Sequence, residues 1–395
     1  MKRIAFYFIL ISGLWSQNSY DVLRPFWGFN HSQILSNSIG GATVASGYIT
    51  PGLTSNPANL AAVPFTYLQI NLSNAEFQNN SSSISNTGFN GIDFVQPFPV
   101  YRGSFVVSAG AHKSKDYMLS YQSSSSNEEN ENQILDYSEK GNLSSYHIGA
   151  AVEFAKGLYL GADLKLLLGD NEMTIHYDSD STDYYSPDYS GLSVTLGILH
   201  SLSKNFQYGI SIDMPTSLHV EEPFTYSNHL NPDHSYSGLS EYYVKKPVTL
   251  HIGAAFLTKI FNIFYEAEHT DWSSLEFSSE GIYEEDLELP ASVLINEEIR
   301  DNFHQTISHH LGTAMRVPFI PLHLFAGYQY IPFPEIDGHY GDDARETYSM
   351  GFSLGIKENI SIQGSADNCS WKFEGLNESF NKFSLGVSIH DIPGF

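Results

Sequence analysis

Apolar and polar residues alternate with a period of two along most of the chain after residue 100. From Asn205 to Met214 the even positions are Phe, Tyr, Ile, Ile and Met, and the odd positions are Asn, Gln, Gly, Ser and Asp. The same alternation recurs over residues 158–168 and 347–356. Successive side chains of a β-strand point to opposite faces, so each segment predicts a strand with one apolar and one polar face. No stretch with a helical period competes with these segments.

The lengths of the connections separate the two folds that fit this alternation, a β-sandwich and a β-barrel. Short segments such as 357–359 alternate with long ones such as 271–303. This order is typical of an up-and-down transmembrane barrel, which has short turns on one rim and long loops on the other. The fold class is therefore predicted as all-β: an antiparallel transmembrane barrel of about fourteen strands. The predicted strands are 65–76, 103–111, 116–123, 143–155, 157–169, 189–200, 205–214, 247–257, 260–269, 304–316, 321–331, 346–356, 359–366 and 382–390.

Composition favours the barrel over several soluble domains. Charged residues make up 16% of the chain and aromatic residues 14%, whereas soluble domains carry about 25% charged residues. A barrel wall needs few charges because one face of every strand meets lipid. The net charge of −25 argues against nucleic acid and anionic membrane surfaces as partners.

Most of the acidic residues fall in the long segments between predicted strands. Solvated loops that resist aggregation explain this distribution. Divalent cations that bridge these acidic loops to outer-membrane lipopolysaccharide, or a salt-rich habitat, would explain it as well.

The N-terminus has the pattern of a secretory signal peptide. Lys2 and Arg3 precede the largely apolar run 4–14, and small Ser16 follows. A membrane-anchoring helix would need roughly 20 apolar residues, so this run is too short to span a bilayer. We predict a signal peptide over residues 1–16, export, and a final location in the bacterial outer membrane.

Residues 17–64 show no strand alternation and are rich in small side chains. A barrel of about fourteen strands has a lumen too wide for its own side chains to fill. Glycine and other small residues let backbone pack closely in a confined space. We therefore predict that residues 17–64 form a hatch, or plug, inside a barrel formed by residues 65–395.

Two motifs in this segment resemble the hatch of the FadL/TodX family of outer-membrane transporters. They are the turn containing Gly40 and Gly41 and the sequence Asn56-Pro57-Ala58. Later stretches are similar to the family's strands and occur in the same order: 264–273, 310–316, 324–334 and 345–351. The resemblance implies a fourteen-stranded, porin-like barrel that transports a hydrophobic small-molecule ligand, such as a long-chain fatty acid or an aromatic hydrocarbon. It also implies ligand binding in the barrel and rearrangement of the hatch.

Few residues indicate other chemistry. Arg316 and Lys165 lie on the polar side of the predicted wall, where they could contact a ligand carboxylate or simply pair with acids and water. His309 and His310 are adjacent in a strand, face opposite sides, and cannot chelate one metal. The single cysteine, Cys369, cannot form an intrachain disulfide. No zinc signature, nucleophile elbow or phosphate loop is found, so we expect no catalytic residue, no metal and no cofactor, and the chain is not predicted to be an enzyme.

Two alternative functions stay open on these observations. Barrels with this hatch pattern also resemble PorV-type scaffold or shuttle components of a secretion system, which bind a protein partner. The long, acidic and aromatic segment 271–303 favours that alternative. An outer-membrane barrel hydrolase would need a nucleophile and a base brought together by the fold, which the sequence neither shows nor excludes.

Overall fold

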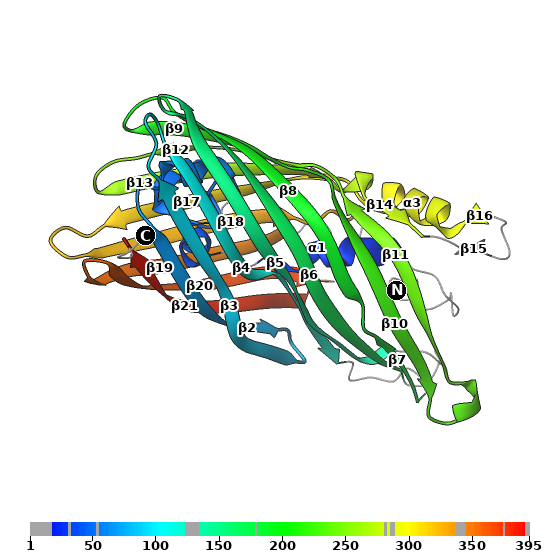
Figure 1. Ribbon diagram of the computed structural model, residues 1–395. Coiled ribbons are helices and arrows are strands. Elements are labelled where there is room, and N and C mark those ends of the chain that lie inside the picture. The colour runs from blue at the N-terminus through cyan, green and yellow to red at the C-terminus, as the bar shows by residue number, and fades with distance from the viewer. Residues whose placement is uncertain are drawn as a thin grey trace.

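The computed structural model describes residues 18–30, 33–52, 55–122, 134–177, 180–279, 283–284, 289–336, 344–373 and 376–391. The predicted signal peptide 1–16 and the C-terminal Phe395 lie outside these ranges. One large antiparallel sheet contains 19 strands and is closed into a barrel (Figure 1). A separate two-stranded sheet is formed by β15 (Tyr283–Glu284) and β16 (Leu289–Pro290).

The barrel closes because its first and last strands pair with each other. β2 (Tyr67–Gln78) pairs with β3 (Ser83–Phe98) on one side and with β21 (Leu376–His390) on the other. The pairing continues in order from β3 through β4 (Phe105–Gln122), β5 (Ile134–Ala155), β6 (Leu158–Tyr177), β8 (Asp188–Ser201), β9 (Phe206–Asp213), β12 (Thr249–Phe256), β13 (Phe261–Asp271), β17 (Gln305–Arg316), β18 (Leu322–Pro332), β19 (Ala344–Lys357) and β20 (Ile360–Phe373) to β21.

Two further strands complete the wall. β10 (Thr216–Asn228) continues β9 after an interruption at Met214 and Pro215, and β11 (Tyr236–Lys246) precedes β12 across Pro247 and Val248. β10 and β11 pair with each other, and β8 pairs with both β9 and β10, so β9 with β10 and β11 with β12 form two long, interrupted strands among the sixteen strand elements of the wall. Three short strands pair with strands of the wall: β1 (Phe29–Asn30) with β4, β7 (Ser181–Tyr185) with β6 and β10, and β14 (Glu276–Ser278) with β11.

The expected barrel is present, and its sixteen strand elements fill fourteen positions around the wall, because β9 and β10 share one position and β11 and β12 share another. Several predicted strand positions are corrected. The segment 215–246, predicted as a loop, is the β10–β11 hairpin. The segment 77–102, also predicted as a loop, contains β3, whereas the predicted strands 103–111 and 116–123 are the single strand β4. A bulge between Lys113 and Lys115 shifts the register within β4 and resembles a turn in the sequence. β3 and β10 carry many small or polar residues, so backbone pairing with their neighbours, and not alternation, defines them.

Along most of the wall the apolar face of the strands points outward and the polar face points into the barrel; β10 and β11 instead turn Leu218, Val220 and Val244 inward. In β9, Ile210 is 39% exposed on the outside, whereas Ser211 is 1% exposed on the inside. Large exposed apolar side chains on other strands include Leu72, Ile148, Leu164, Leu196, Ile252, Leu311, Met350 and Leu385. An apolar exterior around a polar lumen is the arrangement of transmembrane barrels, and it is the reverse of a soluble protein.

The described residues of the N-terminal segment, 18–30, 33–52 and 55–64, lie inside the barrel. Its α2 (Ile34–Ser38) contacts β18, β19, β20 and β21, whereas its η3 (Pro57–Ala62) contacts β4, β5, β6 and β8. These strands belong to different sides of the wall, so the segment spans the lumen between them. Between the two helices lies η2 (Gly47–Ile49).

Helix α1 (Ser19–Trp27) precedes this part of the segment and lies within the end of the barrel opposite the short turns (Figure 1). Its first turn is closed by a capping box. The Asn18 side chain accepts hydrogen bonds from the backbone N–H groups of Tyr20 and Asp21, and the Asp21 carboxylate accepts one from Asn18 N at 2.9 Å. Such a cap satisfies N–H groups that a helix end leaves without partners.

The same end of the barrel carries the remaining helical elements, η4 (Pro232–His234), η5 (Trp272–Ser274) and α3 (Ala291–Asn302). α3 packs against α1 and β14, and Ser19 Oγ donates a hydrogen bond to Glu298 Oε1 at 3.0 Å. Among the residues described, none of the helices has the length and apolar character to cross a membrane.

Candidate functional site

The wall strands carry glycines where they contact the N-terminal segment. A Cβ atom on Gly209 would lie 2.1 Å from the Val44 carbonyl oxygen, and one on Gly327 would lie 2.0 Å from the Gly40 nitrogen. Both distances are well below van der Waals contact, so the segment's backbone touches the wall backbone directly. The inward glycines of other strands make similar approaches: Gly161, Gly197, Gly253, Gly312 and Gly351.

The predicted hatch motif residues all lie at this contact. Gly40 and Gly41 have φ angles of +63° and +71°, a left-handed conformation that favours glycine. His310 Nδ1 donates a hydrogen bond to the Gly40 carbonyl at 3.0 Å. Asn56 Nδ2 donates to the carbonyls of Val44 at 2.7 Å and Ile198 at 2.9 Å. The turn at residues 40–41 and the Asn56 region are therefore both fastened to the wall.

The Asn56-Pro57-Ala58 sequence also accounts for the start of η3 at this point of the chain. Asn56 Oδ1 accepts a hydrogen bond from Ala58 N at 3.0 Å, which caps η3. Pro57 occupies the first turn of η3, where its missing N–H costs nothing. Asn59 Nδ2 donates to the Thr43 carbonyl at 2.7 Å, so η3 is joined to the preceding part of the segment.

Glu266 on β13 forms the most extensive polar contact between the wall and the N-terminal segment. Its Oε2 accepts hydrogen bonds from Thr43 N at 2.7 Å, Val44 N at 2.7 Å and Ser55 Oγ at 3.1 Å. Its Oε1 lies 2.9 Å from His251 Nδ1. The side chain is only 1% exposed, and hydrogen bonds to an ionised acceptor are about twice as strong as neutral ones. Glu266 therefore anchors the segment.

A cavity of about 340 Å³ remains between the N-terminal segment and the wall. Its lining is strongly charged. The basic side chains around it are Lys115, Lys165, Lys246, Arg345 and Lys382, and the acidic ones are Asp213, Glu266, Glu268 and Asp367. This cavity can therefore hold a polar or charged group, such as the carboxylate of an amphipathic ligand.

The structure separates the two residues predicted to contact a ligand carboxylate. Lys165 lines the cavity, where its Nζ donates to Thr195 Oγ1 at 2.9 Å and lies 3.8 Å from Asp163 Oδ2. Arg316 is exposed at the end of β17, outside the lining of this cavity. His309 and His310 face opposite sides of the wall, as expected: His309 is paired with Tyr265 on the outside, and His310 is buried inside.

An apolar layer surrounds α1 beyond this polar cavity. Val22, Leu23 and Phe26 of α1 pack against inward side chains of the wall and against α3. The wall contributes Tyr117, Leu143, Leu167, Tyr189, Leu218, Val220, Tyr242 and Val244. The inside of the barrel thus changes from polar at the N-terminal turn region to apolar around α1.

Arg345 stands at the edge of this layer among four aromatic rings. Its guanidinium carbon lies 4.8 Å from the ring centroid of Trp27, 4.7 Å from that of Phe29, 5.5 Å from that of Phe333 and 5.3 Å from that of Trp371. Its Nη1 also donates to the Trp27 carbonyl at 3.0 Å. Arg345 therefore ties the end of α1 to strands β19 and β20.

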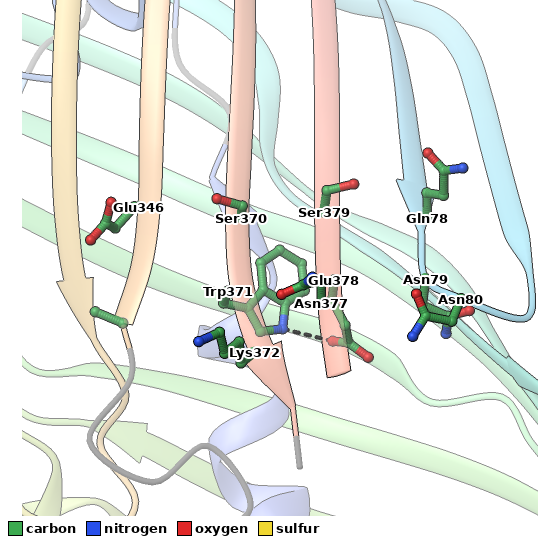
Figure 2. A pocket seen from close by; sticks show the side chains of 11 residues that line it. Gln78, Asn79, Asn80, Glu346, Ser370, Trp371, Lys372, Asn377, Glu378 and Ser379 are labelled. Atoms are coloured by element: carbon green, nitrogen blue, oxygen red, sulfur yellow. Dashed lines mark hydrogen bonds between the residues drawn. The ribbon is translucent and has the colours of Figure 1, made fainter. Parts of the chain in front are cut away.

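A second cavity, of about 470 Å³, opens at the long-loop rim beside β2, β20 and β21 (Figure 2). Figure 2 shows Trp371 and Glu378 pointing toward each other; Trp371 Nε1 donates to Glu378 Oε2 at 2.6 Å. The rest of its lining is largely polar: Gln78, Asn79, Asn80, Glu346, Ser370, Lys372, Asn377 and Ser379, together with Ala344. This composition suits water more than an apolar ligand.

Two described parts of the segment 271–303, which favoured a protein partner, pack against the rest of the barrel: residues 271–277 and 291–303. Ile295 is 5% exposed and Ile299 is 0% exposed, and both pack in the apolar layer with α1. Trp272 Nε1 donates to Thr306 Oγ1 at 2.9 Å. These apolar residues of the segment are thus used inside the molecule.

Sequence reasoning did not identify the Glu266 anchor, the Arg345 contacts or the inward glycines. Each depends on residues that are far apart in the chain and that meet only through the register of the strands. One signal was available: an inward-facing glycine recurs once in each of several strands.

Solved structures of two hydrocarbon channels share this fold. The Pseudomonas putida toluene transporter TodX has a TM-score of 0.62 and 16% identity, over 92% of this chain and 98% of that chain. The CymD monoaromatic hydrocarbon channel has a TM-score of 0.59 and 15% identity, over 92% of this chain and 97% of that chain. At this identity the likeness shows the fold. No family model matches the sequence, and no curated protein matches it either.

Proposed function

We propose that this chain carries hydrophobic small molecules across the bacterial outer membrane and that residues 17–64 act as its hatch. The observation that carries the proposal is a barrel lumen occupied by its own N-terminal segment, which is held there by hydrogen bonds. The two solved channels named above, described as a toluene transporter and a monoaromatic hydrocarbon channel, support it by their shared fold. Aromatic hydrocarbons and long-chain fatty acids are the ligand classes to test first.

The outer surface supports the proposed location. The apolar side chains of Ile148, Leu196 and Leu385 are 44–69% exposed on the outside of the wall, where contact with water would be unfavourable and contact with lipid would not. Residues 1–16 would supply the export signal. Lipid, and lipopolysaccharide at the outer rim, would surround the folded barrel.

Ligand entry would begin at the apolar layer around α1. A hydrophobic molecule arriving from the long-loop rim could replace the contacts that Val22, Leu23 and Phe26 make with the wall. Passage beyond this layer requires the N-terminal segment to move, because its backbone touches the wall at Gly209 and Gly327. That movement breaks the hydrogen bonds of Thr43, Val44 and Ser55 to Glu266. For a fatty acid, Lys165 in the cavity would attract the carboxylate.

Uptake into proteoliposomes tests the proposal directly. Purified full-length protein should accelerate entry of a long-chain fatty acid or an alkylbenzene, measured against protein-free vesicles. The double variant Asn56→Ala, Pro57→Ala should change that rate because it removes the bonds to the Val44 and Ile198 carbonyls.

Asn262→Ala is the matched control. Asn262 Oδ1 accepts a hydrogen bond from Thr258 N at 2.8 Å in an exposed turn, away from the N-terminal segment. Its uptake rate should equal that of the unmodified protein. Equal uptake with and without protein, across several apolar ligands, would overturn the proposed function.

A further inference from the structure

Three adjacent strands bring two histidines and an aspartate together on the inside of the wall. In the register, Asp93 of β3 is opposite Gly110 of β4, and Gly110 is opposite His147 of β5. His112 is two residues along β4 from Gly110 and therefore shares its face. Each of the three residues offers one ligand atom, and these atoms all lie within 4.8 Å of one another.

Gly110 allows the side chains of Asp93 and His147 to lie close to each other. A Cβ atom there would lie 2.6 Å from His147 Cε1 and 2.7 Å from Asp93 Oδ1, so any larger residue would push the two side chains apart. Asp93 Oδ1 and His147 Nε2 are 3.6 Å apart. Two ligands of a tetrahedral zinc ion, at Zn–N and Zn–O distances of about 2.0–2.1 Å, are separated by about 3.3 Å. The observed spacing is thus close to that of a bound ion.

Two members of this cluster, Asp93 and His147, lack the hydrogen bonds that burial normally requires. Asp93 is 1% exposed and His147 is 2% exposed. Within the part of the chain that the structure describes, neither oxygen of Asp93 and neither ring nitrogen of His147 makes a hydrogen bond of normal geometry; their polar neighbours include each other, at 3.6 Å, and the Gln33 side chain beside Asp93. Buried charges are generally paired or coordinate metals, because an isolated buried carboxylate is strongly unfavourable. A cation between these side chains would satisfy them together.

We propose that Asp93, His112 and His147 bind a divalent first-row transition-metal ion, with Zn²⁺ as the reference ion. Imidazole ligands select such ions over Mg²⁺ and Ca²⁺, which prefer oxygen ligands. His112 and Ser145 line the lumen cavity, so the ion can enter from there. The remaining coordination positions face this cavity and would hold water or a ligand group.

The bound ion links β3, β4 and β5 through their side chains, in addition to the backbone pairing. One of the proposed ligands, His147, is on β5, and the same strand contacts η3. A Cβ atom on Gly149 of β5 would be 3.1 Å from Leu60 Cδ1. Metal binding therefore stiffens the wall against which the N-terminal segment rests. This inference is independent of the transported ligand.

Zn²⁺ titration of the chelator-treated, full-length barrel in detergent tests the site. One tight Zn²⁺ per chain is expected, and Co²⁺ in its place should give the visible absorption of a four-coordinate site with nitrogen ligands. Asp93→Asn and His147→Gln should each weaken binding by at least about 100-fold, because even loss of a residue that only supports a ligand costs 10–100-fold. His309→Ala, which removes a histidine from the outer face, is the matched control and should bind like the unmodified protein.

A separate measurement distinguishes loss of metal binding from loss of folding. Gel mobility before and after heating reports whether each barrel is folded. On the unmodified protein, Zn²⁺ should protect His112, which lines the cavity, but not His309 on the outer face, from a histidine-modifying reagent mapped by mass spectrometry. Absence of a tight site, or Zn²⁺ binding that is unchanged in Asp93→Asn and His147→Gln and leaves His112 unprotected, would overturn the proposal.

Discussion

Removal of the Glu266 carboxylate should release the N-terminal segment from the barrel wall. In Glu266→Ala, the N–H groups of Thr43 and Val44 and the hydroxyl of Ser55 lose the acceptor that they share. The Asn56 and Asn59 bonds stay in place, so the segment should remain inside the barrel but open more often. The wall should still close, because the β12–β13 and β13–β17 ladders do not use this side chain.

The size of the effect follows from these contacts. A hydrogen bond to a charged group contributes about 1.5–3 kcal/mol. Three such bonds would exceed 4 kcal/mol if they were additive, but water that enters the space left by the carboxylate will satisfy part of the lost bonding. We therefore expect closure of the segment to weaken by about 3–6 kcal/mol. At 1.4 kcal/mol per factor of ten, the open population rises by roughly 10²- to 10⁴-fold.

Hydrogen exchange followed by mass spectrometry measures this population. Peptides covering residues 40–61 should exchange faster in Glu266→Ala by that factor, whereas peptides from β20 and β21 should not change. Glu266→Gln, which keeps an oxygen acceptor without the charge, should give an intermediate rate.

Glu153→Ala is the control for loss of a carboxylate acceptor. Glu153 Oε1 accepts a hydrogen bond from Gly157 N at 2.9 Å in the turn between β5 and β6, so its removal should leave the 40–61 peptides unchanged. If those peptides exchange at the same rate in a folded Glu266→Ala barrel as in the unmodified protein, Glu266 does not anchor the segment.

Three other substitutions probe the remaining parts of the structure. Gly209→Ala places a methyl group 2.1 Å from the Val44 carbonyl oxygen and should destabilise the packed segment by about 1–3 kcal/mol. The expected result is faster proteolysis within residues 40–61. Gly88→Ala is the control, because a Cβ atom there meets nothing within 4 Å, and it should have no effect. Leu196→Arg puts a charge on the outer face and should lower the free energy of unfolding in lipid by about 2–4 kcal/mol if this face is in the membrane core; an unchanged urea midpoint would argue against that placement. Arg345→Met removes the cation from among its four aromatic rings and the hydrogen bond to the Trp27 carbonyl. It should weaken the docking of α1 by about 2 kcal/mol. Hydrogen exchange in residues 18–30 should then be roughly 30-fold faster.

Local sequence patterns were sufficient for the class of fold and for the direction of its faces. Alternation with period two depends only on neighbouring residues, so the order of residues alone assigns Phe206, Tyr208 and Ile210 to one face. The same argument separated His309 from His310. The absence of alternation in residues 17–64, and their small side chains, also marked a segment that is not part of the wall.

Tertiary structure decided what depends on register between strands. β3 and the β10–β11 hairpin have weak alternation, and only pairing with their neighbours makes them strands. Glu266 meets Thr43, and Asp93 meets His147 across Gly110, because strands distant in sequence are aligned at particular residues. A one-residue shift would turn these side chains to the other face. Sequence alone therefore determined the two faces of the strongly alternating strands, whereas closure of the barrel around its N-terminal segment determined which inward side chains meet.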